Sequence, residues 1–75
     1  MKFGGKIVAI TYNKLWKLLI DRNMKKRELQ QLANISSSSI AKLGKNENVN
    51  TDILVRICKA LNCELEDIME LTDAE

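Results

Sequence analysis

The 75-residue chain contains no proline and only three glycines, two of which lie within its first five residues. Breaks in secondary structure must therefore fall at glycine, asparagine or helix-capping residues. Asparagine tolerates the left-handed backbone conformation that ends many helices. Between its asparagines the chain carries apolar residues at helical spacing. The sequence thus predicts several short helices separated by brief polar breaks.

Five segments show this apolar helical pattern. With connections of two to five residues, they predict an all-α bundle of five helices. We expect Ile20 in the first helix, Leu32 in the second and Leu65 in the fifth to lie on inward faces. The predicted helices span residues 13–23, 26–33, 37–45, 51–61 and 64–69.

A short strand is predicted before the first helix, over residues 6–10, because Ile7, Val8 and Ile10 favour extended backbone. An unpaired apolar strand edge invites a partner. We therefore expect this strand to pair with its symmetry mate in a dimer or with residues 68–71. The whole chain is interpreted as one domain, with an N-terminal arm or strand over residues 1–11 and an acidic tail over residues 70–75.

Composition excludes several classes of protein. No apolar run approaches the ~20 residues of a membrane span, and no secretory signal is recognisable, so we expect a cytoplasmic protein without membrane contact. Cys58 and Cys63 are five residues apart and the chain has no histidine, which argues against a metal site. We expect two reduced, buried thiols, no cofactor and no small-molecule ligand.

Charge is divided unevenly along the chain. Residues 1–45 hold ten lysines and arginines against two acids, whereas residues 46–75 hold two basic residues against eight acids. These halves carry net charges of +8 and −6. A domain so divided would turn its basic end toward a polyanion, although chance clustering of solvated charges gives the same count.

Residues 26–45 have the organisation of a helix-turn-helix. The two predicted helices are too close for an antiparallel hairpin, so they should cross at a large angle. Asn34 can supply the positive φ of the turn, and Ile35 should lie between the helices. Ser36 is a good N-cap for the second of them. The expected apolar seam comprises Leu29, Ala33, Ile35, Ile40 and Leu43.

The stretch MKKRELQQLANISSSSIAKLGKNENVNTDILVRICKALNCELEDIM resembles the Cro/CI-type helix-turn-helix family, often called the XRE family, of small bacterial and phage transcriptional regulators. The resemblance covers about residues 13–69 and implies a five-helix, lambda-repressor-like DNA-binding domain. Two positions depart from the family pattern. Asn34 stands where the family usually has glycine, and Gln30 stands where it usually has a small residue.

The resemblance implies that the third helix enters the major groove of double-stranded DNA. Its implied base-contacting residues are Ser37, Ser38 and Lys42, with Ser39 or Ala41 at the edge. A serine hydroxyl cannot make a bidentate base contact, so we expect modest specificity per half-site. The start of a surface helix is the alternative interpretation of the serines. The implied phosphate-contacting residues are Lys25, Lys26, Arg27, Ser36, Lys45, Asn46, Asn48 and Asn50.

One such domain reads only a few base pairs, so we expect a homodimer with two third helices about 34 Å apart. The expected function is a sequence-specific transcriptional regulator, specifically a repressor. The alternative is a protein-interaction module, such as an antitoxin that docks a basic partner against residues 64–75. An enzyme is not expected, because the chain has no histidine and no glycine-rich phosphate loop, and we assign no catalytic residue.

Overall fold

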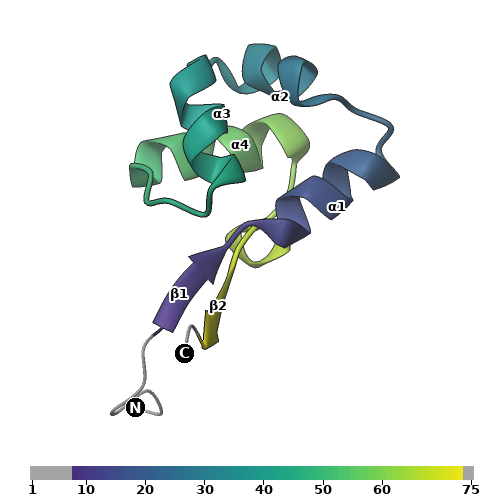
Figure 1. Ribbon diagram of the computed structural model, residues 1–75. Coiled ribbons are helices and arrows are strands. Elements are labelled where there is room, and N and C mark those ends of the chain that lie inside the picture. The colour runs from purple at the N-terminus through teal and green to yellow at the C-terminus, as the bar shows by residue number, and fades with distance from the viewer. Residues whose placement is uncertain (1–7, 74–75) are drawn as a thin grey trace.

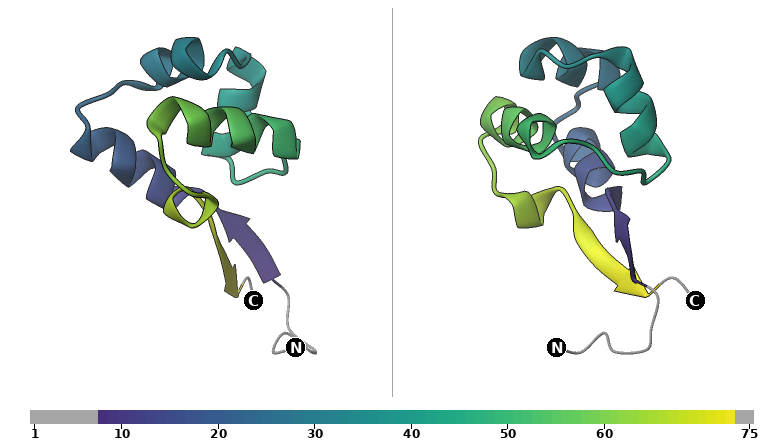
Figure 2. Two further views of the ribbon diagram at one scale, coloured as in Figure 1. Left: turned by 180° about the vertical axis from the view of Figure 1, so that it is seen from behind. Right: turned by 90° about the vertical axis from the view of Figure 1, so that its left-hand side faces the viewer.

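The computed structural model describes residues 8–73 and consists of a helical body from which a two-stranded ribbon projects (Figure 1). The four longer predicted helices are confirmed to within two residues at each end. Two further views show the same separation of ribbon and helical body (Figure 2). In chain order the elements are β1 (Val8–Thr11), α1 (Asn13–Asp21), α2 (Lys26–Ala33), α3 (Ser37–Gly44), α4 (Thr51–Leu61), the 3₁₀ turn η1 (Leu65–Asp67) and β2 (Glu70–Asp73).

All four α-helices are followed by an asparagine in the left-handed conformation, with φ between 53° and 57°. This confirms the role expected of asparagine in a chain without proline. At the end of α3 the left-handed residue is Asn46, whereas Gly44 is the last residue of the helix itself. The four asparagines are Asn23, Asn34, Asn46 and Asn62.

One core joins all four helices with the segment before β2. The predicted seam of the helix-turn-helix is confirmed, since four of its five members are buried and Ile40 packs against them partly exposed. Tyr12, directly before α1, is also in the core, with 1% of its surface exposed. The buried residues are Tyr12, Leu15, Leu19, Leu29, Ala33, Ile35, Leu43, Leu54, Ile57, Leu61 and Ile68.

The predicted fifth helix is wrong, because residues 64–69 form only the single 3₁₀ turn η1. The Asp67 carboxylate accepts a hydrogen bond from the backbone N–H of Glu64, 2.9 Å away, which closes this turn on itself. The chain becomes extended at Glu70, where β2 begins, so a second helical turn has no room. Ile68 is buried, whereas Leu65, which was expected on an inward face, remains 50% exposed.

Two apolar residues expected on inward helix faces are exposed: Ile20 by 76% and Leu32 by 60%. In α2 the buried residues are Leu29 and Ala33, and Gln30 on their flank is half-buried. Successive residues are rotated by about 100° around a helix, so Leu32 falls on the opposite flank of that narrow stripe. The same geometry turns Ile20 away from the stripe of α1.

The strands β1 and β2 form an antiparallel pair, so the all-α prediction becomes a mostly helical fold with a small sheet. Ile10 lies opposite Leu71 and Thr11 opposite Glu70. The described part of the predicted N-terminal strand thus pairs within the chain with residues 70–73, which overlap the predicted partner segment 68–71 and were also expected to form an acidic tail. Residues 6, 7, 74 and 75 of these two predicted segments lie outside the described residues.

Candidate nucleic-acid interface

The turn between α2 and α3 is held by backbone and side-chain hydrogen bonds. Asn34 adopts φ 55° and ψ 51°, and the N–H of Ile35 donates to the carbonyl of Gln30 at 3.1 Å. The Arg56 guanidinium on α4 donates to the Asn34 carbonyl at 3.0 Å. Gln30 stands where the family usually has a small residue. It is half-buried beside the turn, and α2 and α3 still cross there. Figure 1 shows α3 in front of α4, and the right-hand view of Figure 2 shows α3 at the outer edge of the helical body.

The first turn of α3 is built from consecutive serines. Ser36 is the N-cap, and its Oγ accepts from the N–H of Ser39 at 3.2 Å, which confirms its expected capping role. Oγ atoms of Ser36 and Ser38 lie 2.9 Å apart. Ser37 and Ser38 are exposed, whereas Leu43 on the inner side of the same helix is buried. The serine hydroxyls therefore line an accessible helix end that is braced by its own side chains.

A polar hollow of about 120 Å³ lies beside α3. It brings Ser39 and Lys42 of α3 together with Asn48 and Asn50 from the loop that leads to α4. Asn50 is the N-cap residue of α4 but makes no capping hydrogen bond through its side chain. The hollow thus gathers amide, hydroxyl and ammonium groups, which are the groups that contact nucleic-acid backbones and base edges.

The loop after α3 is anchored to the residue before α1. Asn46 Oδ1 accepts from the backbone N–H of Tyr12 at 3.0 Å, and the Tyr12 hydroxyl donates to the Glu47 carbonyl at 3.1 Å. Asn46 is therefore a structural residue of the loop as well as an expected phosphate contact. Lys45, directly before it, is exposed.

Three exposed basic residues, Lys25, Lys26 and Arg27, stand at the start of α2, at the other end of that helix from α3. The Lys26 ammonium lies over the ring of Trp16, 4.5 Å from the ring centroid. The Glu28 carboxylate accepts from the backbone N–H of Lys25 at 2.8 Å, which caps this helix end. The contact with Trp16 of α1 orients the Lys26 side chain. A count of charges along the sequence does not reveal this constraint.

The uneven charge along the chain does not translate into one wholly basic end. Lys14, Lys17 and Arg22 of the basic half line a hollow of about 450 Å³ together with Glu66 and Asp67. Lys14 also donates to the Glu66 carbonyl at 3.1 Å. The basic residues at the start of α2 remain exposed, whereas those of α1 meet acidic residues of the second half of the chain in this hollow.

Residues 8–73 contain neither a cluster of metal-ligating side chains nor a helix that could span a membrane. No group of three or more histidine, cysteine or acidic side chains in this range could hold a metal ion. None of the helices described is long and apolar enough to cross a membrane.

Sequence reasoning missed Arg56 and Trp16 as residues that position the candidate interface. Arg56 lies 22 residues from Asn34 in the sequence. Trp16 on α1 is half-buried beneath Lys26. Neither residue belongs to the helix-turn-helix segment, so only the tertiary fold links them to it.

Comparison with known proteins agrees with this geometry. The family model of the Cro/C1-type HTH DNA-binding domain matches residues 14–74. The crystal structure of the transcriptional regulator VanUg is 51% identical in sequence and superposes with a TM-score of 0.86, covering 99% of this chain and 96% of that chain. Comparison with curated proteins gives no significant match.

Proposed function

Because the chain belongs to the Cro/C1-type helix-turn-helix family of DNA-binding domains, we propose that it is a sequence-specific transcriptional regulator that inserts α3 into the major groove. The observation that carries this proposal is the two-sidedness of α3. Its inner residue Leu43 is fully buried, whereas Ser37, Ser38 and Lys42 on its other sides are exposed. The similar crystal structure is that of a transcriptional regulator.

In this proposal Ser37, Ser38 and Lys42 contact base edges. The lysine ammonium reaches guanine acceptors, whereas the single-oxygen hydroxyls discriminate weakly. Phosphates are contacted on both sides of α3, by the start of α2 and by the loop toward α4. The proposed phosphate-contacting residues are Lys25, Lys26, Arg27, Ser36, Lys45, Asn46 and Asn48.

We propose further that the protein binds as a homodimer joined through the ribbon of β1 and β2. A two-stranded ribbon alone is marginally stable in water, and this one projects from the helical body. Among residues 8–73, each strand has one backbone edge paired with the other strand and a second edge without a strand partner, which a second copy could pair with. Leu71, opposite Ile10, is 54% exposed and would be covered in such a pair.

The dimer is tested by sedimentation at increasing protein concentration. We expect Leu71→Lys to weaken self-association, with Thr72→Lys on the other ribbon face as the matched control. A wild-type protein that remains monomeric at high micromolar concentration would exclude this dimer.

The proposed sign of regulation is repression. A bound dimer covers the base pairs it reads and blocks access of other proteins to them. That action needs no surface beyond the candidate interface.

DNA binding is tested by titrating the protein into random-sequence duplex at two salt concentrations and by selecting bound sequences from a random pool. Affinity should fall steeply as salt rises, because each neutralised phosphate releases counterions. A palindromic motif should emerge from the pool. Binding that is absent or insensitive to salt would instead favour a protein-interaction role.

A further inference from the structure

The end of α4 brings the two cysteines of the chain together. Asn62 is left-handed with φ 53° and ψ 55°, and the N–H of Cys63 donates to the Cys58 carbonyl at 3.0 Å. A second bond runs from the N–H of Asn62 to the Lys59 carbonyl at 3.4 Å. These two bonds define a Schellman motif, in which the residues at the positions of Cys58 and Cys63 are brought near each other and often pack together.

A Schellman motif at the end of α1 shows which side-chain contact usually accompanies this backbone arrangement. At the end of α1 it pairs Leu19 with Met24, whose N–H donates to the Leu19 carbonyl at 2.8 Å, and both side chains pack in the core. At the end of α4 the two apolar partners are replaced by thiols. Cys58 and Cys63 line the same hollow beside this helix end. The two positions that hold apolar partners at the end of α1 therefore hold two oxidisable groups at the end of α4.

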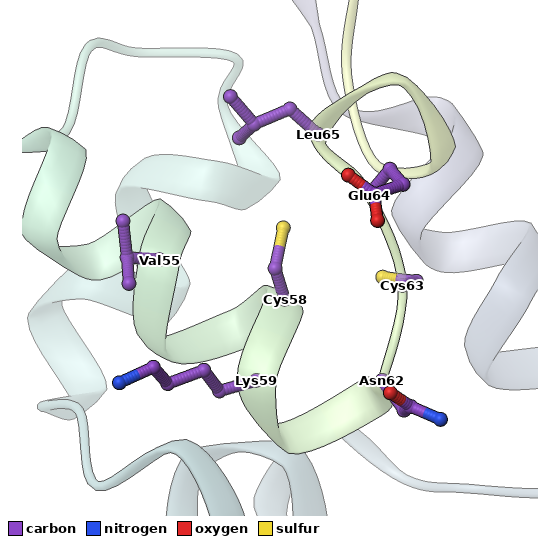
Figure 3. A pocket seen from close by; sticks show the side chains of 7 residues that line it. All are labelled: Val55, Cys58, Lys59, Asn62, Cys63, Glu64 and Leu65. Atoms are coloured by element: carbon purple, nitrogen blue, oxygen red, sulfur yellow. The ribbon is translucent and has the colours of Figure 1, made fainter.

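Both thiols are accessible to small molecules. They are half-buried and line an open hollow of about 300 Å³ with Val55, Lys59 and Leu65. Figure 3 shows Cys58 on α4 and Cys63 on the segment after it, with the Cys63 sulfur directed toward the Cys58 side of the hollow. No residue of α2 or α3 lines this hollow, so it is separate from the candidate nucleic-acid interface.

We propose that Cys58 and Cys63 form a reversible intramolecular disulfide without rearrangement of the fold. In a continuous helix, residues five apart are separated by about 7.5 Å along the axis, which is beyond the Cα separation that a disulfide spans. The left-handed turn at Asn62 removes this obstacle, because it folds the chain back until the backbone N–H of Cys63 reaches the carbonyl of Cys58.

The oxidant in this proposal is a small-molecule disulfide, and Cys63 is the thiol that attacks it. The Cys63 thiolate breaks the reagent S–S bond, forms a mixed disulfide and releases one thiolate. Cys58 gives its proton to the released thiolate and attacks the Cys63 sulfur, which expels the second half of the reagent as a thiolate that is then protonated by water. Two protein thiols are oxidised by two electrons, and the reagent is reduced to two thiols.

The surroundings favour Cys63 for the first step. Burial raises the pKa of both thiols, and Glu64 and Asp67 raise them further by charge repulsion. The Cys58 thiol and Arg22 act in the opposite direction on Cys63, whereas the pKa of Cys58 rises to about 11. Formation of the disulfide should therefore be slow at neutral pH. Its rate should increase about tenfold for each unit by which the pH rises, until the thiols are ionised.

The test exposes the reduced full-length protein to excess oxidised glutathione under mildly alkaline conditions. Intact mass and alkylation in denaturant then count the remaining thiols. We expect an intramolecular disulfide with no free thiol and no attached glutathione, and its complete reversal by dithiothreitol. Oxidation should raise Tm by about 5 °C or more, because the closed loop restricts the unfolded chain. The Cys58→Ser/Cys63→Ser variant should show no shift under the same treatment.

Single variants test the assigned order of attack. Cys58→Ser, which retains Cys63, should accumulate a glutathione adduct faster than Cys63→Ser does. Faster adduct formation on Cys63→Ser would overturn that order. Two glutathione adducts on the wild-type protein, disulfide-linked dimers, or a lower Tm after oxidation would each overturn the proposed disulfide itself.

Discussion

The Arg56 guanidinium donates a hydrogen bond to the backbone carbonyl of Asn34, 3.0 Å away, while its Nε donates to the Asp52 carboxylate at 2.9 Å. One side chain of α4 therefore connects the start of its own helix to the turn between α2 and α3. The carbonyl it binds belongs to the residue that sets the crossing of the two helices. Arg56 thus supports the orientation of α3 without lying on it.

Arg56→Ala should lower the free energy of unfolding by about 1 kcal/mol, because an exposed charge-assisted hydrogen bond to a carbonyl is lost. The measurement is urea unfolding followed by circular dichroism. Asp52→Asn is the matched control and should change stability by less than about 0.5 kcal/mol, since the Arg56–Asp52 ion pair is exposed. Equal losses in both variants would mean that the ion pair, rather than the bond to Asn34, stabilises the turn.

Replacement of Asn34 tests the left-handed turn directly. Asn34→Ala should cost about 1 kcal/mol, because φ of 55° is unfavourable for a residue with an ordinary β-carbon. Asn34→Gly should lie within about 0.5 kcal/mol of wild type, since glycine adopts this conformation freely. Asn48→Ala, an exposed asparagine outside the left-handed region, controls for loss of the amide. If Asn34→Ala and Asn48→Ala are equally stable in urea, backbone strain does not govern this turn.

Tyr12 should make stability depend on alkaline pH. Burial raises the pKa of its phenol above the ordinary value of about 10. The folded state therefore holds this proton more tightly, so the contribution is fully present below about pH 10 and is lost as pH rises further. Urea unfolding of wild type and Tyr12→Phe across this range isolates the effect. Tyr12 is the single tyrosine of the chain, so its ionisation can also be followed by absorbance.

Tyr12→Phe should also lose about 1 kcal/mol at neutral pH, because the Glu47 carbonyl loses the hydroxyl that donates to it. The difference between the two proteins should shrink above about pH 10. A constant difference at all pH values would contradict the assigned ionisation.

Lys42 and Lys26 should have different effects on DNA binding if the proposed roles are correct. Lys42→Ala should relax the preference at one position of the selected motif by about 1–3 kcal/mol. Lys26→Ala should weaken binding to all DNA sequences about equally. It should also reduce the slope of log affinity against log salt concentration by about one. Both effects are measured by titration of motif and mutated duplexes at several salt concentrations.

Lys59→Ala is the control for that comparison. Lys59 lines the hollow at the end of α4, away from α3, so its loss should leave DNA affinity nearly unchanged. A uniform loss of affinity for Lys42→Ala would remove Lys42 from the set of base-contacting residues.

Much of the helical body could be predicted from local signals. Asparagines marked the ends of four helices because the left-handed conformation is a property of the residue and its immediate neighbours. Ser36 was identifiable as an N-cap for the same reason. The apolar seam followed from helical spacing in the two helices and from the position of Ile35 in the turn between them.

The errors arose where tertiary context decides the outcome. The segment 64–69 has a helical pattern, but pairing of the following residues with β1 limits it to η1. Nothing in the sequence around Leu32 and Ile20 indicates that the buried stripe of each helix is narrow enough to leave these two residues exposed. The anchoring of the Asn46 loop by Tyr12 joins residues 34 positions apart, and no local pattern reports such a contact.

The register of β1 and β2 affects the order in which the elements of this chain fold and unfold. Val8 lies opposite Asp73, so this pairing closes a loop that contains almost the entire described chain. Helices form from neighbouring residues, whereas such a distant encounter carries the largest loss of chain entropy. The ribbon should therefore be the last element to form during folding. In hydrogen exchange it should be the first to lose its amide protection, while the amides of the helices remain protected.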